Sequence, residues 1–387
     1  MRNFNLICGL AERHVVHLLS FGDGREDSTS PIHKVCRSVG IVDAPQRTMG
    51  QRMKGLVLSP LPDMALRLPS AKFRQALTSI LRREDLDVVE VEGIELAQYL
   101  FQVAEIRGDS SRPLLVFDDH NAEYVLQQRA FETDARLPKR WVAAAYSFVQ
   151  WRRLRSYERA ACQAADRVVA VSRTDAEALR DLVPGLEPAI VPNGVDMAYY
   201  SQTVEPLNGT QRPRESDLVF TAKMDFRPNV DAVLWFSGEV LPLIRAQAPD
   251  VRLWIVGKDP HPRLASLNSD PGIIVTGWVE DVRPYIVGAG VYVVPLRMGG
   301  GTRLKVLEAM AMGTAVVSTQ VGCEGFEVTS GQELLIADSP ATFAAAVLDL
   351  LRSPAQRDAL GSAARTFARL YDWPLIVPRL ERLYQES

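Results

Sequence analysis

Short runs of apolar, often β-branched residues alternate with longer helical patterns along most of this 387-residue chain. Most of the runs are apolar on both faces, as parallel strands covered by helices on each side are. In the first half they are predicted at His14–Phe21, Leu86–Val91, Leu114–Asp118, Arg167–Ser172 and Ala189–Pro192. In the second half they are predicted at Asp217–Thr221, Val251–Gly257, Gly272–Gly277, Val291–Leu296, Ala315–Thr319 and Glu333–Ala337. The alternation predicts an α/β fold with two doubly wound, Rossmann-like sheets.

The length of the chain also indicates two domains, because 387 residues exceed one ordinary hydrophobic core. A polar, turn-rich stretch at Ser201–Ser216 separates the two series of strands, so we place the linker there. We therefore expect an N-terminal domain over residues 1–200 and a C-terminal domain over residues 213–370.

Composition excludes several other classes of protein. The net charge of −3 provides no basic field for nucleic acid, so any anion site must be local. The four cysteines are scattered, without the spacing of a disulfide framework or a structural zinc site, and favour a reducing cytoplasm. No apolar run approaches the roughly 20 residues of a membrane span.

The start of the chain departs from a doubly wound pattern. Residues 2–13 read as a helix with Phe4, Ile7, Leu10 and Ala11 on one face, ahead of the first strand. A doubly wound domain normally begins with a strand that lies in the middle of its sheet. We expect that this first strand and its loop are missing; a variant sheet that begins with a helix is the alternative.

A glycine-rich segment in the second half carries the clearest chemical signal. The predicted strand Val291–Leu296 runs into Gly299–Gly301, and a helix follows from near Thr302, a possible cap, to just before Gly313. A glycine loop that leads into a helix presents free N–H groups and the positive end of the helix dipole to a phosphate. Arg303 and Lys305 oppose that dipole unless an anion binds beside them.

Glu308 lies further along the same predicted helix, at the border of its buried stripe. A carboxylate in such a place needs a partner. The two hydroxyls of a ribose would supply one, because a carboxylate accepts two hydrogen bonds from a diol. A neighbouring arginine or lysine is the structural alternative, and spacing alone does not decide between them.

This segment resembles the donor-binding signature of glycosyltransferase family 4, a Glu followed eight residues later by Glu-Ala-Met-Ala and Gly. Glu308–Ala311 and Gly313 match its second half, whereas Gly300 stands where the first Glu would be. The run Gly299–Lys305 is similar to a glycine-rich subgroup of the family. The resemblance makes Glu308 a candidate catalytic residue and implies that it holds the ribose of a nucleotide-diphosphate sugar. The implied diphosphate contacts are Gly300, Gly301, Thr302, Arg303 and Lys305.

Other segments resemble the same family. Val191–Asp196 is similar to its interdomain segment, and Phe220–Asp231 to the first strand and loop of its second domain. That second match makes Lys223 and Arg227 candidate phosphate contacts. Residues 371–387 resemble the family's final helix, which crosses back to the N-terminal domain. The resemblance therefore implies the GT-B fold, in which two Rossmann-like domains face a cleft that binds the donor.

His120 is the candidate catalytic residue of the first half. It follows the predicted strand Leu114–Asp118, and polar groups gather where a parallel strand ends at the carboxyl edge of its sheet. The family resemblance implies that His120 contacts the donor sugar or supports the reaction. Asp119 and Glu123 are weaker candidates, and Ser172 reads equally well as a helix cap or a ligand contact.

Basic and aromatic residues interleave through Arg129–Arg155. A helix with a basic, aromatic face can lie on anionic lipid, so peripheral contact with the inner face of a membrane is one interpretation. A solvated helix with some buried aromatic residues is the other.

These observations and the resemblance together suggest a cytoplasmic, bacterial, retaining glycosyltransferase that needs no metal and no cofactor. No Asp-x-Asp motif lies near the glycine-rich segment, and no His, Asp and Glu residues have metal-site spacing. The donor would be a nucleotide sugar and the acceptor a glycan or a lipid-linked glycan, in exopolysaccharide or envelope synthesis. Two alternatives stay open: a donor-binding protein without turnover, and a nucleotide-sugar epimerase of the same fold.

Overall fold

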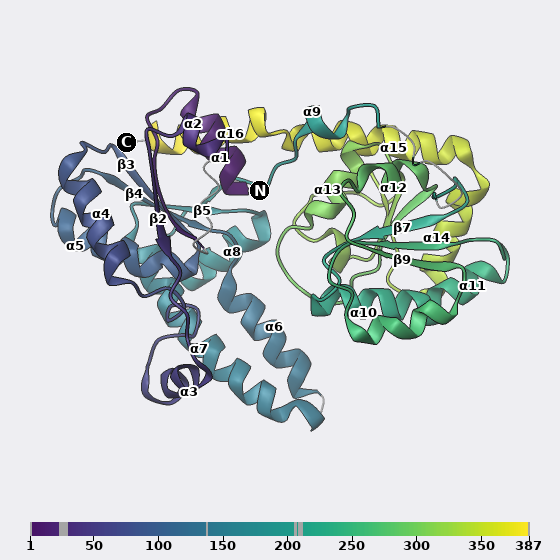
Figure 1. Cartoon of the computed structure of the whole chain (residues 1–387), viewed down its shortest axis with the longest axis horizontal. Helices are drawn as coiled ribbons and strands as arrows, with labels where there is room; N and C mark the ends of the chain where they lie inside the picture. The colour runs from purple at the N-terminus through teal and green to yellow at the C-terminus, as the bar shows by residue number, and fades with distance from the viewer. Residues whose placement is uncertain (1, 23–29, 137, 205–206, 208–211, 386–387) are drawn as a thin grey trace. The chain divides into compact units, whose positions relative to one another are not determined.

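The computed structural model describes residues 2–22, 30–136, 138–204, 207 and 212–385. The chain forms two compact units, one of Met1–Pro192 with Pro374–Ser387 and one of Asn193–Trp373 (Figure 1). The boundary after Pro192 comes earlier in the chain than the predicted linker Ser201–Ser216. Residues 205–206 and 208–211 of that linker lie outside the described part of the chain.

The first unit contains parallel strands in two groups. Four strands form one sheet in the order β3-β4-β5-β6, and two strands pair with each other as β1-β2. Their bounds are β1 His17–Gly22, β2 Ser38–Asp43, β3 Val88–Glu92, β4 Leu114–Asp119, β5 Arg167–Ala170 and β6 Ala189–Ile190. The expectation that a first strand is missing stays a prediction. β2 was not predicted, because Gly40 interrupts its short apolar run and its side chains are only partly buried.

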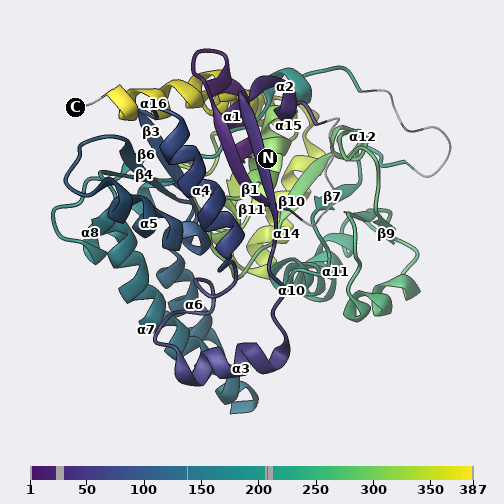
Figure 2. The same cartoon turned by 60° about the vertical axis from the view of Figure 1, so that its left-hand side comes forward.

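Helices cover these strands, and two of them form a long antiparallel hairpin, α6 with α7, that Figures 1 and 2 show from two sides. The helices are α1 Arg2–Ala11, α2 Ile32–Val35, α3 Met49–Leu58, α4 Ala71–Arg83, α5 Ala97–Arg107, α6 Glu123–Ala135, α7 Trp141–Ala164, α8 Arg173–Leu182 and α16 Trp373–Gln385, with short 3-10 turns at Ile94–Leu96 and Pro138–Arg140. The predicted first helix exists, but its predicted face is wrong. Arg2 and Leu6 are its buried residues, and Phe4 is exposed, because Arg2 pairs with Asp118 in the interior.

The second unit is a single doubly wound sheet in the order β12-β11-β10-β7-β8-β9. The strands are β7 Leu218–Thr221, β8 Leu253–Val256, β9 Ile273–Gly277, β10 Val291–Val294, β11 Val316–Ser318 and β12 Leu335–Ile336. β7 comes first in the chain and lies between β8 and β10, so the order reverses there. Each strand falls within a predicted run, and the α/β prediction of Rossmann-like sheets is confirmed.

Both faces of this sheet are buried, which explains why its strands read as continuous apolar runs. Leu218 and Phe220 pack into a core cluster on one face, and Val219 packs into a cluster on the other. The covering helices are α9 Met197–Tyr200, α10 Arg227–Trp235, α11 Leu241–Arg245, α12 Arg283–Gly288, α13 Leu304–Ala311, α14 Pro340–Arg352 and α15 Pro354–Ala368. Shorter helical turns occupy Phe236–Val240, Pro262–Ser269, Val321–Cys323 and Arg369–Tyr371.

Gly257, at the end of β8, permits a close approach between two strand ends. Its φ is +148°, and a Cβ placed there would lie 1.7 Å from the carbonyl oxygen of Ala222. We expect Gly257→Ala to lower the free energy of unfolding by about 2–4 kcal/mol, since both backbone strain and a steric clash oppose it. Calorimetric unfolding measures the loss. Gly238→Ala is the control, because its Cβ would meet nothing, and equal stability of the two variants would contradict the prediction.

Candidate functional site

The second unit places two loops at the point where its strand order reverses. β7 pairs with both β8 and β10, and one loop leaves β7 towards α10 while the other leaves β10 towards α13. In open α/β sheets, ligands bind outside the carboxyl ends of the strands at this switch point. The glycine-rich segment is the second of these loops, so the topology places it where a ligand is expected.

The glycine-rich loop has a backbone that favours glycine. Gly299 and Gly301 have φ values of +114° and +75°. The Arg303 guanidinium folds back over the loop, and its Nη1 donates to the carbonyl oxygen of Gly300 at 2.6 Å. Among the described residues, the N–H groups of Gly301 and Thr302 donate to no protein acceptor. This loop therefore offers an anion two backbone donors beside a guanidinium.

The predicted start of the helix at Thr302 is corrected. α13 begins at Leu304 with Arg303 at its N-cap, so Thr302 is not the cap. The N–H of Leu304 donates to the carbonyl oxygen of Thr302 at 3.2 Å, and is therefore not free for a ligand. The Thr302 hydroxyl is instead buried and has no hydrogen-bond partner in the described part of the chain. A buried hydroxyl without a partner is costly, and a ligand at the loop would satisfy it.

Lys305 points back under the loop, towards the start of α10. Its Nζ donates to Oδ1 of Asn229 at 2.8 Å and lies 4.4 Å from the ring centroid of Phe220. Burial, followed by the charge of Arg303, lowers the pKa of Lys305 to about 7, although the charge of Glu308 acts in the opposite direction. An anion bound at the loop would oppose both effects, so this lysine is suited to take up a proton as a phosphate binds.

Glu308 has a hydrogen-bond partner that the sequence did not predict. The expected partners were ribose hydroxyls or a neighbouring arginine or lysine. The hydroxyl of Tyr200, at the end of α9, donates to its carboxylate, and the charge of Lys305 also favours the ionised form. Burial outweighs both and raises the pKa of Glu308 above its usual value. The carboxylate therefore carries a desolvation cost that one tyrosine and one lysine only partly offset, and further donors such as ribose hydroxyls would reduce it.

The two candidates in the loop after β7 differ in their surroundings. Lys223 pairs with Asp225 at 3.0 Å, and its carbonyl oxygen accepts from Nδ2 of Asn229 at 2.8 Å. Arg227 is the first residue of α10 and is exposed. Asn229 therefore joins the two loops, since it contacts both Lys305 and the Lys223 backbone. The binding roles of all the named donor-site residues stay predictions.

Sequence reasoning missed Asn229 and Tyr200. Asn229 is polar in the first turn of a helix at a switch-point loop, which is a usable signal. Tyr200 has no comparable signal, because only the folded chain shows that its short helix packs against α13.

The first unit gathers a second group of charged residues at the ends of β3 and β4. Nε2 of His120 lies 2.5 Å from Oε2 of Glu92. Burial opposes the charged form of His120, but the hydrogen bond to Glu92 and the charge of Asp118 outweigh it and raise the pKa. Gly93, with a φ of +81°, lies directly beside the imidazole. His120 is therefore held in place and readily protonated, as a proton donor or an electrostatic contact would be.

Asp118 completes this group and is fully buried. Nη2 of Arg2 donates to its Oδ2 at 2.6 Å, while burial raises the pKa of Asp118 to about 6. Ligand atoms of Glu92, Asp118 and His120 lie within 4.8 Å of one another, a cluster that sequence spacing did not indicate. Arg2 already balances the charge of Asp118, and Glu92 and His120 bind each other, so these pairings compete with a metal ion.

The remaining polar candidates of the first unit, Asp119, Glu123 and Ser172, have partners within the fold, and their binding roles stay predictions. Ser172 caps α8 by accepting from the N–H of Asp175 at 3.1 Å. The carboxylate of Glu158 accepts from the N–H groups of Glu123 and Tyr124 at the start of α6, at 2.8 and 2.9 Å. Asp119 is buried beside Glu158, and burial followed by the charge of Glu158 raises its pKa well above the usual range.

This buried carboxyl pair predicts an unusual pH dependence of stability. Burial raises the pKa of Glu158 from 4.5 to about 7. A carboxyl with a raised folded-state pKa binds more protons when folded, so stability is fully present below pH 4.5 and falls as pH rises through 7. We expect Asp119→Asn to reduce this fall and to stabilise the protein by about 1–2 kcal/mol at pH 8. Unfolding measured at pH 5 and pH 8 tests it. The exposed Asp181→Asn is the control, and an unchanged slope in Asp119→Asn would contradict the prediction.

Comparison with known proteins assigns both halves of the chain. Residues 2–199 match the family described as Glycosyltransferase Family 4, and residues 215–353 match the family described as Glycosyl transferases group 1. An uncharacterized 44.6 kDa protein in the cps region of Klebsiella pneumoniae is 22% identical over 336 residues, 84% of this chain and 78% of that protein. The phosphatidyl-myo-inositol mannosyltransferase of Mycobacterium tuberculosis is 28% identical over 214 residues, 52% of this chain and 54% of that enzyme. The chain thus spans about half the length of the mannosyltransferases it matches.

Solved structures share the fold at low identity. A sucrose-phosphate synthase from Thermosynechococcus elongatus has a TM-score of 0.70 at 19% identity, covering 99% of this chain and 91% of that one. Anabaena Alr3699/HepE, in complex with UDP and glucose, has a TM-score of 0.63 at 13% identity, covering 100% and 95%. The family models, which match residues 2–199 and 215–353, show that the chain belongs to glycosyltransferase family 4.

Proposed function

We propose that this protein is a retaining, metal-independent hexosyltransferase that moves a sugar from a nucleotide-diphosphate donor to a glycan or lipid-linked acceptor. The observation that carries the proposal is the glycine-rich loop at the switch point of the second sheet. Arg303, Lys305 and Glu308 lie around it, with two N–H groups and a buried hydroxyl that have no partner among the residues the structure describes. The N–H groups and the two cations suit a diphosphate, and the carboxylate of Glu308 suits a ribose.

The diphosphate is assigned to the loop and the start of α13. The N–H groups of Gly301 and Thr302 would donate to its oxygens, as at other helix N-termini. Lys305 and Arg303 would supply positive charge that grows in importance as the sugar leaves and the diphosphate gains charge. These cations take the part that a metal ion plays in other transferases. Gly300 would let the backbone approach the ligand, and Arg227 and Lys223, the latter once released from Asp225, would contact phosphate oxygens from the neighbouring loop.

The ribose is assigned to Glu308. Its carboxylate can accept hydrogen bonds from both ribose hydroxyls, and Tyr200 holds it in position. Uridine diphosphate is the first nucleotide to test, because Alr3699/HepE binds UDP in the same fold. The mannosyltransferase relatives make GDP-linked sugars the second class to test.

The reaction is proposed to occur with retention of the anomeric configuration. The acceptor hydroxyl would attack from the face on which the diphosphate leaves, and a diphosphate oxygen would take its proton. His120, held by Glu92, would support the reaction. The cps-region relative supports a glycan acceptor in exopolysaccharide or envelope synthesis, and the mannosyltransferases support a lipid-linked one.

Donor turnover in the presence of EDTA tests this proposal. A panel of UDP- and GDP-sugars is incubated with the protein, with and without a lipid-linked or oligosaccharide acceptor, and NMR records the anomeric configuration of the product. We expect nucleotide release from one donor, no effect of EDTA, and retention. Inversion or loss of activity in EDTA would contradict the mechanism. Binding without turnover would indicate a donor-binding protein, and a changed sugar without an acceptor would indicate an epimerase.

A further inference from the structure

Exposed apolar side chains gather in one part of the first unit. In the described residues, nine of the 22 large apolar side chains that are exposed lie in residues 49–61 or 141–148. On α3 they are Met49, Met53, Val57 and Leu58, of which the first three are spaced four residues apart and so form one stripe along the helix. On the first turns of α7 they are Trp141, Val142, Tyr146 and Phe148, of which Val142, at 89%, is the most exposed.

The two groups lie side by side. α3 lies next to α7 in both Figure 1 and Figure 2. Met53 and Leu56 of α3 and Tyr146 of α7 line a common hollow of about 210 Å³. Nη2 of Arg153 donates to the carbonyl oxygen of Leu56 at 2.9 Å, which ties the end of α3 to α7. We call the stripe on α3 together with Trp141 and Val142 the apolar face.

Positive charge surrounds the apolar face. Arg52 and Lys54 are exposed on α3, and Arg136 and Lys139 are exposed just before α7. Two of the nearby acids are neutralised, because Asp63 pairs with Arg47 and Asp134 pairs with Arg140. An apolar surface bordered by cations matches the boundary between the anionic headgroups and the acyl chains of a membrane.

The sequence predicts membrane contact along all of Arg129–Arg155. The structure restricts the surface that could make this contact to a part of that segment. Phe131, Phe148 and Trp151 pack against one another between α6 and α7, with ring centroids 5.3 to 6.1 Å apart. Those aromatic residues therefore contribute to helix packing. The start of α7 remains exposed and could contact a membrane. The apolar stripe on α3, which the sequence did not predict, adds to this surface.

We propose that the apolar face docks this protein on an anionic lipid bilayer, with Met53, Val57, Trp141 and Val142 entering the interface and the four cations contacting headgroups. The contact is peripheral, since no helix within the described residues has both the length and the apolar character to cross a bilayer. Docking is independent of the proposed donor site, so either can fail without the other.

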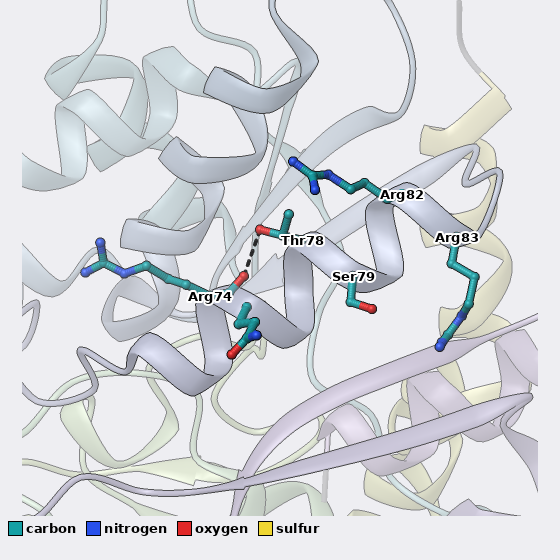
Figure 3. A pocket seen from close by; sticks show the side chains of 6 residues that line it. Arg74, Thr78, Ser79, Arg82 and Arg83 are labelled. Atoms are coloured by element: carbon teal, nitrogen blue, oxygen red, sulfur yellow. Dashed lines mark hydrogen bonds between the residues drawn. The ribbon is translucent and has the colours of Figure 1, made fainter.

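The matched control surface is on α4. Arg74, Arg82 and Arg83 line a shallow hollow there, and Figure 3 shows their side chains spreading away from one another along the helix. None of the exposed large apolar side chains lies on α4. This surface has cations without an apolar stripe. Removing its arginines therefore tests whether general charge attraction, rather than the apolar face, accounts for binding to vesicles.

Vesicle flotation tests the proposal with phosphatidylglycerol–phosphatidylcholine vesicles and with phosphatidylcholine alone. We expect binding to the anionic vesicles only, and at least about a tenfold loss of partitioning in Val57→Ser/Val142→Ser. Removing the three α4 arginines should leave most of the binding intact. Val57, Val142 and the three α4 arginines are all exposed, and calorimetric unfolding measured without vesicles checks that each variant is folded.

Tryptophan fluorescence gives a second measurement on the same vesicles. Trp141 is 64% exposed on the apolar face, and Trp278 is 71% exposed on the second unit. Vesicles should shift the emission of the protein to the blue, and Trp141→Phe should remove that shift while Trp278→Phe keeps it. Equal binding of the Val57→Ser/Val142→Ser variant, or a shift that survives Trp141→Phe, would overturn the proposal. Dimerisation that depends on Val57 and Val142 would assign the face to a second copy of the chain instead.

Discussion

Glu308→Ala is expected to lower kcat/KM for donor turnover by about a hundredfold or more, with a matching loss of nucleotide affinity. Hydrogen bonds to a charged group contribute about 1.5–3 kcal/mol each, and the proposed ribose contact has two. The variant also leaves the hydroxyl of Tyr200 without its acceptor. Calorimetric titration with the donor and a nucleotide-release assay measure both effects.

Two further variants separate binding from folding in this experiment. Glu308→Gln keeps one acceptor oxygen and should lose about tenfold. Because burial raises the pKa of Glu308, the neutral glutamine should leave the protein as stable as before or more stable. Glu239→Ala, at an exposed position of the same unit, should change nothing. Unchanged donor affinity in folded Glu308→Ala would contradict the ribose assignment.

Lys305→Gln is expected to lower kcat by about a hundredfold, the loss typical when one preorganised donor to a developing negative charge is removed. Substitution should have this large effect on kcat because Nζ of Lys305 donates to Oδ1 of Asn229 at 2.8 Å, which holds the lysine beside the proposed diphosphate. Burial is the main cause that lowers the pKa of Lys305 to about 7, so about half of the free molecules carry it uncharged at neutral pH.

The lowered pKa of Lys305 predicts that donor binding takes up protons, an effect that a general structural defect would not produce. A bound diphosphate favours the charged form and raises the pKa of Lys305, so donor binding takes up protons at and above pH 7. Affinity should fall as pH rises from 7 to 9, by up to about tenfold per pH unit. Titrations in buffers of different ionisation enthalpy count the protons. Lys305→Gln should abolish the proton uptake, whereas Lys258→Gln, at an exposed position, should keep it. Proton uptake that survives in Lys305→Gln would refute the assignment of Lys305 to the diphosphate.

The sequence predicted the second unit better than the first, for a physical reason. Every strand from β7 to β12 is predicted within a longer apolar run, because residues such as Val219 and Phe220 are buried on opposite faces of the same sheet. In the first unit, β2 has partly exposed side chains and a central glycine, so its pattern resembles a loop. The face of α1 was predicted wrongly for a related reason, since periodicity assumes that apolar residues point inward and Arg2 does so here.

The candidate site was predicted as a list of residues but not as a set of contacts. Local spacing identified Gly301, Arg303, Lys305 and Glu308 because all lie on one loop and helix. It could not indicate that Asn229 contacts Lys305, which is 76 residues away in sequence. The same limit applies to Tyr200 at Glu308, and to the pairing of α3 with α7. Contacts between elements distant in sequence depend on packing, which no short motif encodes.

The central claim is that the glycine-rich loop of the second unit binds a nucleotide-diphosphate sugar. Calorimetric titration of the wild-type protein with a panel of UDP- and GDP-sugars, without added metal, tests it most directly. We predict saturable, one-to-one binding of one nucleotide class, with proton uptake near pH 8. No binding of any donor by the folded wild-type protein would contradict the account and leave only the fold.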